Sequence, residues 1–149
     1  MKIVEQYKQY FEEYSKKYEK ERLAIMMQVG DFYEFYGVET ESLCFGNVTQ
    51  IASLLDIVRS RKNKDNPRID INSPLFTGFP KHSAQKHIKK LLDNNYYVVQ
   101  IDQQKDNPTQ RSVSKVLSKG TYIDDLSNNT STTIACIYYG DCGGVGVSF

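Results

Sequence analysis

Hydrophobic and polar positions alternate with a helical spacing at the start of the chain. Aromatic and aliphatic side chains recur every three or four residues between positions 3 and 20, and charged side chains occupy the intervening positions. This spacing predicts an amphipathic helix over residues 3–20. Residues 23–27 then form a short, continuous apolar run that fits a buried strand. Gly30 and Asp31 follow, and such a pair between two strand-like segments favours a tight hairpin turn.

Two further helices are predicted from the same kind of spacing. Apolar side chains over residues 48–57 indicate a second helix, for which Asn47 is a candidate N-cap. A third helix is expected from an N-cap at Ser83 to Asp93, and a pair of asparagines ends it.

The remaining regular segments are predicted strands. Residues 74–79 resemble a short strand that stops at a proline, and residues 96–101 are rich in the aromatic and β-branched side chains that strands favour. Alternation over residues 112–118 predicts another, half-buried strand. The fold class predicted is α/β of the α+β type: a mixed β-sheet flanked by about three helices, one of them N-terminal, and followed by a truncated β-hairpin.

A boundary between domains is expected near residue 123. Residues 124–131 are small, polar and unpatterned, as a linker would be. Residues 132–149 read as a strand, a glycine-rich turn and the start of a second strand, with nothing to cover them. We therefore predict a domain over residues 1–123, a linker over 124–131, and the truncated start of a second domain over 132–149.

Composition excludes some classes of protein. Lys and Arg number 19 against 18 Asp and Glu, so the net charge of +1 implies no general attraction to anionic surfaces. No apolar run approaches the length of a membrane span, and the first residues hold no secretory segment. Three cysteines that lack metal-ligand spacing favour reduced thiols, and hence an intracellular protein.

Positive charge is concentrated in two loops. Residues 59–68 contain five Lys or Arg and one Asp, a local charge of +4, and residues 105–119 contain four and one, a local charge of +3. Two separated basic loops on a nearly neutral chain indicate a localised anionic partner. Taken singly, each loop fits a solvated surface segment equally well.

The stretch GDFYEFYG, which follows the first predicted strand, places a carboxylate among four aromatic side chains. In a strand, side chains alternate, so Phe32, Glu34 and Tyr36 share one face while Tyr33 and Phe35 share the other. Tyr33 and Phe35 can then serve the core, while Phe32 and Glu34 project together from an edge or a loop. An exposed phenylalanine beside a carboxylate suits the reading of a ligand. The structural alternative is Phe32 in a core with Glu34 at its solvated rim.

The residues MMQVGDFYEFYG resemble the start of the MutS family of DNA mismatch-repair proteins, whose first domain carries a Gly-Asp-Phe-Tyr-Glu segment. Three further stretches follow in the family's order. IASLLDI resembles the next helix, TGFPKHSAQKHIKKLLDNNYYVVQIDQ resembles a Gly-Ile-Pro-x-His segment with its helix and strand, and KVLSKGTYID resembles a strand ending in Pro-Gly-Thr. The matches span roughly residues 23–125, and the terminal hairpin is similar to the start of the family's connector domain. Gln28, Val29 and Lys119 depart from the family's pattern.

The resemblance implies a mismatch-recognition domain that binds DNA. In the family, the Phe of Phe-x-Glu enters the minor groove and stacks on a mispaired base, and the Glu hydrogen-bonds that base. Phe32 and Glu34 occupy these positions here. The implied partner is duplex DNA that contains mispairs or small loops.

Further site residues follow from the resemblance. Arg61 and Lys62 stand where the family has a basic pair after its second helix, and Lys115 stands where it has a basic residue before Pro-Gly-Thr. Such side chains contact phosphates, which gives affinity without sequence information. Phe76 either lines the minor groove or belongs to the core.

No cofactor and no enzymatic activity are expected for this chain by itself. Full-length family members are ATPases that use ATP and Mg²⁺ in a C-terminal domain, and they act as homo- or hetero-oligomers without a membrane. The glycine-rich residues 140–146 do not form a nucleotide-binding loop, because no Lys-Ser or Lys-Thr follows them.

Two rival functions remain open at this stage. A metal-dependent nuclease would use Asp31 and Glu34 as metal ligands, with Lys62 at the scissile phosphate. A protein-interaction module would anchor Phe32 in a partner's pocket and would have no salt-sensitive affinity for DNA.

Overall fold

The computed structural model describes residues 2–121, 136–139 and 145–148. The chain divides into two compact units, residues 1–119 and residues 120–149, and each is described by itself. The predicted linker over residues 124–131 lies outside the described residues.

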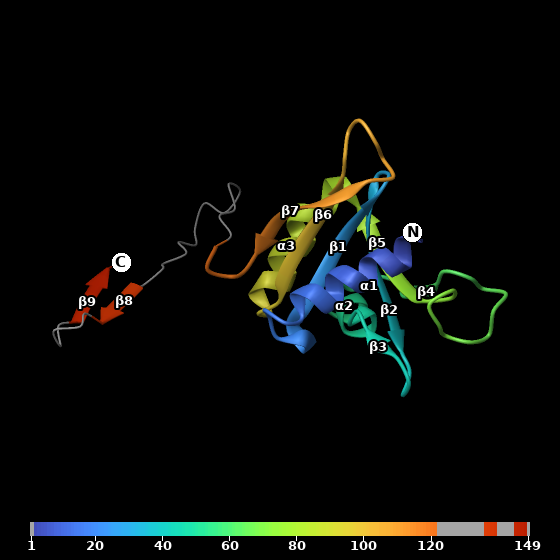
Figure 1. Cartoon of the computed structure of the whole chain (residues 1–149), viewed down its shortest axis with the longest axis horizontal. Helices are drawn as coiled ribbons and strands as arrows, with labels where there is room; N and C mark the ends of the chain where they lie inside the picture. The colour runs from blue at the N-terminus through green and yellow to red at the C-terminus, as the bar shows by residue number, and fades with distance from the viewer. Residues whose placement is uncertain (1, 122–135, 140–144, 149) are drawn as a thin grey trace. The chain divides into compact units, whose positions relative to one another are not determined.

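The larger unit is built on a mixed β-sheet of seven strands (Figure 1). The main path through the sheet runs β4-β5-β2-β1-β6-β7, and β3 pairs with β2 outside this path. β1 and β6 are parallel, whereas the other pairs in this sheet are antiparallel. The strands are β1 (Leu23–Val29), β2 (Phe32–Glu39), β3 (Cys44–Phe45), β4 (Ser60–Arg61), β5 (Leu75–Pro80), β6 (Tyr97–Gln103) and β7 (Arg111–Leu117).

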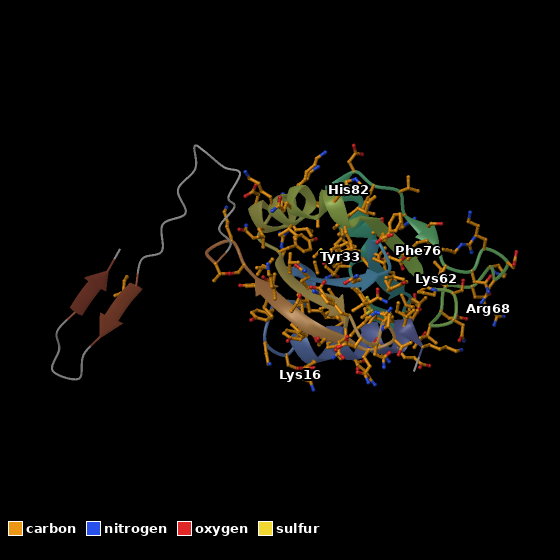
Figure 2. The ribbon with its side chains drawn as sticks, turned by 90° about the horizontal axis from the view of Figure 1, so that it is seen from above. Lys16, Tyr33, Lys62, Arg68, Phe76 and His82 are labelled. Atoms are coloured by element: carbon orange, nitrogen blue, oxygen red, sulfur yellow. The ribbon has the colours of Figure 1, made fainter. Side chains whose placement is uncertain are left out.

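Helices cover both faces of the sheet. α1 (Ile3–Tyr14) lies on one face, while α2 (Val48–Leu55) and α3 (Ala84–Asp93) lie on the other, and Figure 2 shows the resulting three layers edge-on. Two short 3₁₀ turns, η1 (Lys20–Arg22) and η2 (Lys81–Ser83), precede β1 and α3. The mixed sheet with its flanking helices confirms the predicted fold class.

Alternation along β1 divides the core into two layers. Ile25 and Met27 pack in one cluster with Tyr7 and Phe11 of α1. The intervening Met26 is also buried, because it points to the layer under α2 and α3. A strand covered on both faces is apolar at every position, which explains the continuous run that the sequence shows at residues 23–27.

The first helix is shorter than predicted. It ends at Tyr14 rather than near residue 20, because the following turn brings the Tyr18 ring onto Tyr97 of β6, with 4.7 Å between the ring centroids. The tyrosines at positions 14 and 18 thus keep a helical spacing in the sequence. The aromatic contact with β6, however, is made only after the chain has left the helix.

Both predicted N-cap positions, Asn47 and Ser83, are confirmed, but neither side chain makes the capping hydrogen bond. Asn47 precedes α2 with a left-handed φ of 49°, and its side chain donates to the carbonyl oxygens of Lys20 and Leu23 at 2.6 and 3.0 Å. The carboxylate of Glu39 instead accepts from the backbone N–H of Thr49 at 3.1 Å, and so satisfies the start of this helix from outside it. Ser83 precedes α3, but its hydroxyl donates to a carbonyl in β5.

The smaller unit contains the predicted hairpin. β8 (Cys136–Tyr139) and β9 (Val145–Ser148) pair antiparallel. In the larger unit Cys44 is a free, exposed thiol. Among the described residues no helix is long and apolar enough to cross a membrane.

Candidate functional site

One face of β2 changes from fully buried to open along its length. Tyr36 is 0% exposed beneath α1, the Glu34 side chain is 17% exposed, and Phe32 is 48% exposed beside the turn. On the opposite face Tyr33 and Phe35 are buried. The predicted separation of the two faces is therefore confirmed, and Phe32 is not enclosed in a core.

The openness of Phe32 comes from the end of a strand and not from a sheet edge. β2 lies between β1 and β5, so of the two predicted positions, an edge or a loop, the edge is excluded, and Phe32 projects beside the β1–β2 turn. Figure 1 shows α1 lying across the sheet below the β1–β2 turn, which leaves the end of β2 uncovered. Because the neighbouring strands hold the backbone of Phe32 through the pairs Val29–Phe32 and Phe32–Pro80, the exposed ring stands on a rigid base.

The turn that presents Phe32 is tied to its surroundings. Gly30 adopts a left-handed φ of 60°, which favours glycine, and its N–H donates to the side-chain oxygen of Gln103 at 2.9 Å. The carbonyl of Asp31 accepts from the N–H of Lys81 at 2.9 Å. Arg111 donates to the carbonyl of Gln28 at 2.9 Å. The hairpin is thus fixed to η2, β6 and β7.

Glu34 belongs to a polar group that we call the Glu34 cluster: Glu34, Tyr36, Lys62 and Phe76. The Tyr36 hydroxyl donates to a carboxylate oxygen of Glu34. Lys62 Nζ lies 2.7 Å from the same hydroxyl and 3.5 Å from the carboxylate oxygen. The ammonium also lies over the rings of Tyr36 and Phe76, 4.6 and 5.8 Å from their centroids, and Figure 2 shows Lys62 beside Phe76.

The Glu34 cluster stabilises charge of both signs next to a buried core. Burial, followed by the hydrogen bond to Glu34, raises the pKa of the Tyr36 hydroxyl well above its usual value, so the hydroxyl stays a donor. The lysine provides a counter-charge to the carboxylate and makes cation–π contacts with the two rings. Phe76 is half-buried and packs against the α1-side cluster, which supports its core role, while its contact with the minor groove stays a prediction.

Gly78 lets the Glu34 side chain lie flat against β5. The two residues are direct partners in the β2–β5 pair. A Cβ at position 78 would lie 3.3 Å from both Cα and Cγ of Glu34 and 2.6 Å from the carbonyl oxygen of Tyr33. A larger residue there would displace the carboxylate.

The other two residues predicted to contact the DNA backbone, Arg61 and Lys115, do not join the Glu34 cluster. The Arg61 guanidinium donates to the carbonyl oxygens of Asn66 and Pro67, at 3.3 and 3.0 Å, and so closes its own loop.

Lys115 is exposed on the opposite side of the sheet from Phe32 and Glu34. It pairs with Gln100, whose neighbour Ile101 faces α1. Directly paired residues share a face. The structure therefore brings Lys62 and Phe76 to Glu34, but leaves Lys115 apart.

Tyr36 is the site residue that sequence reasoning missed. It was identified as sharing the face of Glu34, but not as its hydrogen-bond donor. The signal was the spacing of two residues within one strand, which places the hydroxyl and the carboxylate side by side.

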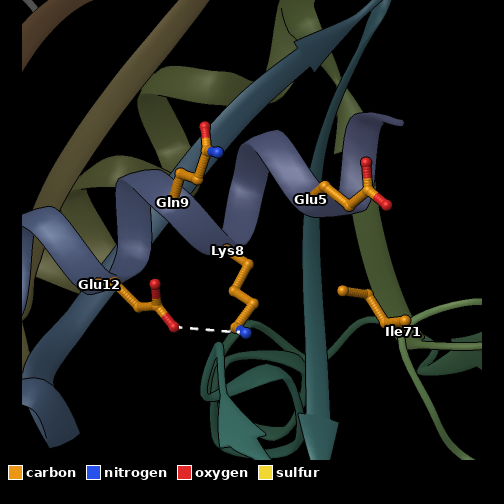
Figure 3. A pocket seen from close by; sticks show the side chains of 5 residues that line it. All are labelled: Glu5, Lys8, Gln9, Glu12 and Ile71. Carbon is orange, nitrogen blue, oxygen red and sulfur yellow. Dashed lines mark ion pairs between the residues drawn. The ribbon is translucent and has the colours of Figure 1, made fainter. Parts of the chain in front are cut away.

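Two other features of the described part of the chain bear on alternative sites. There, no group of three or more His, Cys, Asp or Glu side chains is placed to hold a metal ion. An open hollow on the outer side of α1 is lined by Glu5, Lys8, Gln9, Glu12 and Ile71 (Figure 3). Its Lys8–Glu12 ion pair, at 3.5 Å, joins two residues one helical turn apart and is typical of a solvated helix face.

The fold and the site define a small α/β domain that presents an aromatic ring and a carboxylate at the end of a sheet. Residues 5–126 match the family model described as MutS domain I. The chain belongs to the MutS domain I family.

Similar proteins carry the name DNA mismatch repair protein MutS. The protein of Macrococcus caseolyticus is 33% identical over 122 residues, which cover 77% of this chain and 13% of the relative. That of Fusobacterium nucleatum is 30% identical over 142 residues, 91% of this chain and 14% of the relative. That of Thermosipho melanesiensis is 30% identical over 128 residues, which cover 80% of this chain and 14% of the relative. The chain thus spans about one seventh of the length of these relatives.

Proposed function

We propose that this domain probes duplex DNA for mispairs and small loops, with Phe32 as a wedge that stacks on a mispaired base and Glu34 as a hydrogen-bonding partner of that base. The observation that carries the proposal is the exposure of Phe32, 48%, on the same face as Glu34 in a strand whose other aromatic side chains are buried. Membership of the MutS domain I family supports it.

The energetics of such a wedge select for weak pairing instead of sequence. Unstacking a base step costs a few kcal/mol, and it costs least where pairing is already defective. Stacking on an aromatic ring returns about 1–3 kcal/mol for any base. Because the two terms nearly cancel, the deformability of the DNA decides whether the ring inserts. A ring that is already exposed and held by paired strands needs little reorganisation before it inserts.

Phosphate contacts add affinity without discrimination. The basic loop of residues 59–68 contains Lys62, a member of the Glu34 cluster. Lys115 projects from β7 with an exposed side chain. The loop is suited to contact phosphates near the inserted ring, whereas for Lys115, on the opposite face of the sheet, this contact stays a prediction from the family resemblance. Phosphate contacts make binding dependent on salt.

The remaining expectations concern a longer protein. We propose that residues 1–123 act as the recognition domain, that 124–131 link it to a second domain, and that ATP and Mg²⁺ act elsewhere in a full-length, oligomeric MutS protein. An intracellular location follows from that role. This chain supplies recognition rather than catalysis.

The decisive experiment compares matched and mismatched duplexes of the same length. Fluorescence anisotropy with the purified protein measures the affinity for each, and the ratio of the two affinities is the discrimination. Phe32→Ala is expected to lower discrimination by the equivalent of about 1–3 kcal/mol, the loss of one stacked base, while salt-dependent binding persists. Phe32→Leu keeps apolar volume but has no π-face, so it should behave like alanine.

The thermal midpoint of each variant serves as the control for folding. It should barely change, because the Phe32 ring is half exposed. If Phe32→Ala discriminates as well as the wild type, the wedge is refuted. If the wild type shows no salt-sensitive affinity for either duplex, the exposed ring serves a protein partner instead.

A further inference from the structure

Lys62 is held by the fold in a way that the other cations of its loop are not. It follows β4 directly, and its N–H donates to the carbonyl of Pro74 at 3.0 Å. This bond fixes the backbone beside β5, so the side chain extends over the rings of Phe76 and Tyr36 toward Glu34. The side chain is only 38% exposed, and its ammonium already has an oxygen partner on two residues.

The remaining cations of residues 59–68 divide into two kinds. Arg59 donates to the Thr49 hydroxyl at 2.7 Å, and Arg61 is occupied by the carbonyls of its own loop. Lys64 and Arg68 are exposed, and their side chains make no hydrogen bond or ion pair with the described residues. Figure 2 shows Arg68 further out on the loop than Lys62 and Phe76.

We infer that Lys62 is a positioning residue that holds the Glu34 carboxylate for base recognition, and that Lys64 and Arg68 are the phosphate contacts of this loop. The inference deepens the proposed function and rests on it. It changes the role that the resemblance implies for Lys62, from a contact with the DNA backbone to a specificity-determining contact within the protein.

The physical reason is the sign of the charge on Glu34. A carboxylate that approaches a duplex is repelled by the phosphates, and removal of water by the DNA strengthens that repulsion. An ammonium 3.5 Å away offsets the repulsion and, with the Tyr36 hydroxyl, fixes the carboxylate in one orientation. If Lys62 moved to a phosphate instead, it would leave this carboxylate without its counter-charge and give up its contacts with the two rings.

The test compares Lys62→Met with Lys64→Met in the purified protein, because both variants remove one charge from the same loop. Affinities for matched and mismatched duplexes are measured over a series of salt concentrations. Lys62→Met, which keeps an apolar stem over the rings, is expected to reduce discrimination about fivefold and to leave the salt dependence unchanged. Lys64→Met is expected to weaken both duplexes equally and to reduce the slope of log affinity against log salt by about 0.9.

A second background separates positioning from a general structural effect. In Glu34→Ala, Lys62→Met should cause no further loss of discrimination, because the residue that it positions is absent. Lys62→Arg, which keeps the charge, should retain most of the discrimination. Thermal unfolding of each variant controls for folding, and if Lys62→Met unfolds, Lys62→Gln takes its place.

Two outcomes would overturn the inference. One is a Lys62→Met protein with normal discrimination and a reduced salt slope, as expected for a phosphate contact. The other is an equal loss of discrimination with and without Glu34. Both are distinct from failure of the proposed function, in which Phe32→Ala itself keeps its discrimination.

Discussion

Gly78→Ala is predicted to destabilise the domain and to displace the Glu34 carboxylate. The added Cβ would lie 2.6 Å from the carbonyl oxygen of Tyr33, a distance at which one of the two atoms must move. The oxygen belongs to the backbone of β2, which is paired on both sides, so it cannot move alone. The same Cβ would lie 3.3 Å from Cα and Cγ of Glu34.

Two effects of opposite sign decide the magnitude. Alanine is about 0.5–1 kcal/mol better than glycine inside a strand, because glycine loses more conformational entropy on folding. Overpacking of a well-packed site costs about 1–3 kcal/mol. Since the clash is with backbone in the middle of the sheet, the cost is expected at the upper end of that range. The net loss is then about 2 kcal/mol, or about 6–12 °C in Tm for a domain of this size.

The assay is thermal and urea unfolding followed by circular dichroism, with Gly120→Ala as the control. No heavy atom would lie within 4 Å of a Cβ at Gly120, so that variant should leave the midpoint unchanged. DNA binding by Gly78→Ala should also show reduced discrimination at a temperature where the variant is folded. A midpoint equal to that of the control would show that β2 and β5 absorb the methyl group without cost, and would refute the reasoning.

Two further predictions concern buried polar groups. Tyr36→Phe keeps the ring in the core but removes the hydroxyl that donates to Glu34, so it should cost about 1–2 kcal/mol in urea unfolding and lower mismatch discrimination; unchanged values for both would contradict the role of the hydroxyl. His87 is buried, and its ring stacks on Phe79 with 4.3 Å between centroids. Burial, and after it two neighbouring lysines, lower the pKa of His87 below 6.5, so the folded state binds this proton less readily than the unfolded state. Stability should therefore decline as pH falls below about 6.5, and His87→Phe should flatten the profile between about pH 7.5 and pH 5.5. Parallel profiles for His87→Phe and the wild type would count against this assignment.

Much of the fold could be predicted because its signals are local. The continuous apolar run gave β1, the Gly30–Asp31 pair gave the hairpin, and residues 96–101 gave most of β6. The errors lie at the ends of elements, where distant contacts decide. The first helix ends early because Tyr18 packs on Tyr97. The Asn47 side chain donates hydrogen bonds to the carbonyl oxygens of Lys20 and Leu23, which are distant in the sequence, and so does not cap its own helix.

The candidate site was predicted in part for the same reason. Alternation alone places Phe32 and Glu34 on one face, and the structure agrees. Whether that face is covered depends on where α1 lies, and this is not written in the stretch itself. The assignment of Arg61 and Lys115 to the DNA backbone stays a prediction, with Arg61 occupied by its loop and Lys115 on the opposite face.

By itself, the sequence determined most of the elements, the family and the pair of residues that share one face of β2, because side-chain period and motif are properties of neighbouring positions. Only the tertiary structure decided what surrounds the carboxylate. Lys62 is 28 positions from Glu34 in the chain, and Gly78 reaches it only through the register of β2 and β5. Such contacts depend on which strands pair and in what register, and no local pattern of side chains fixes either.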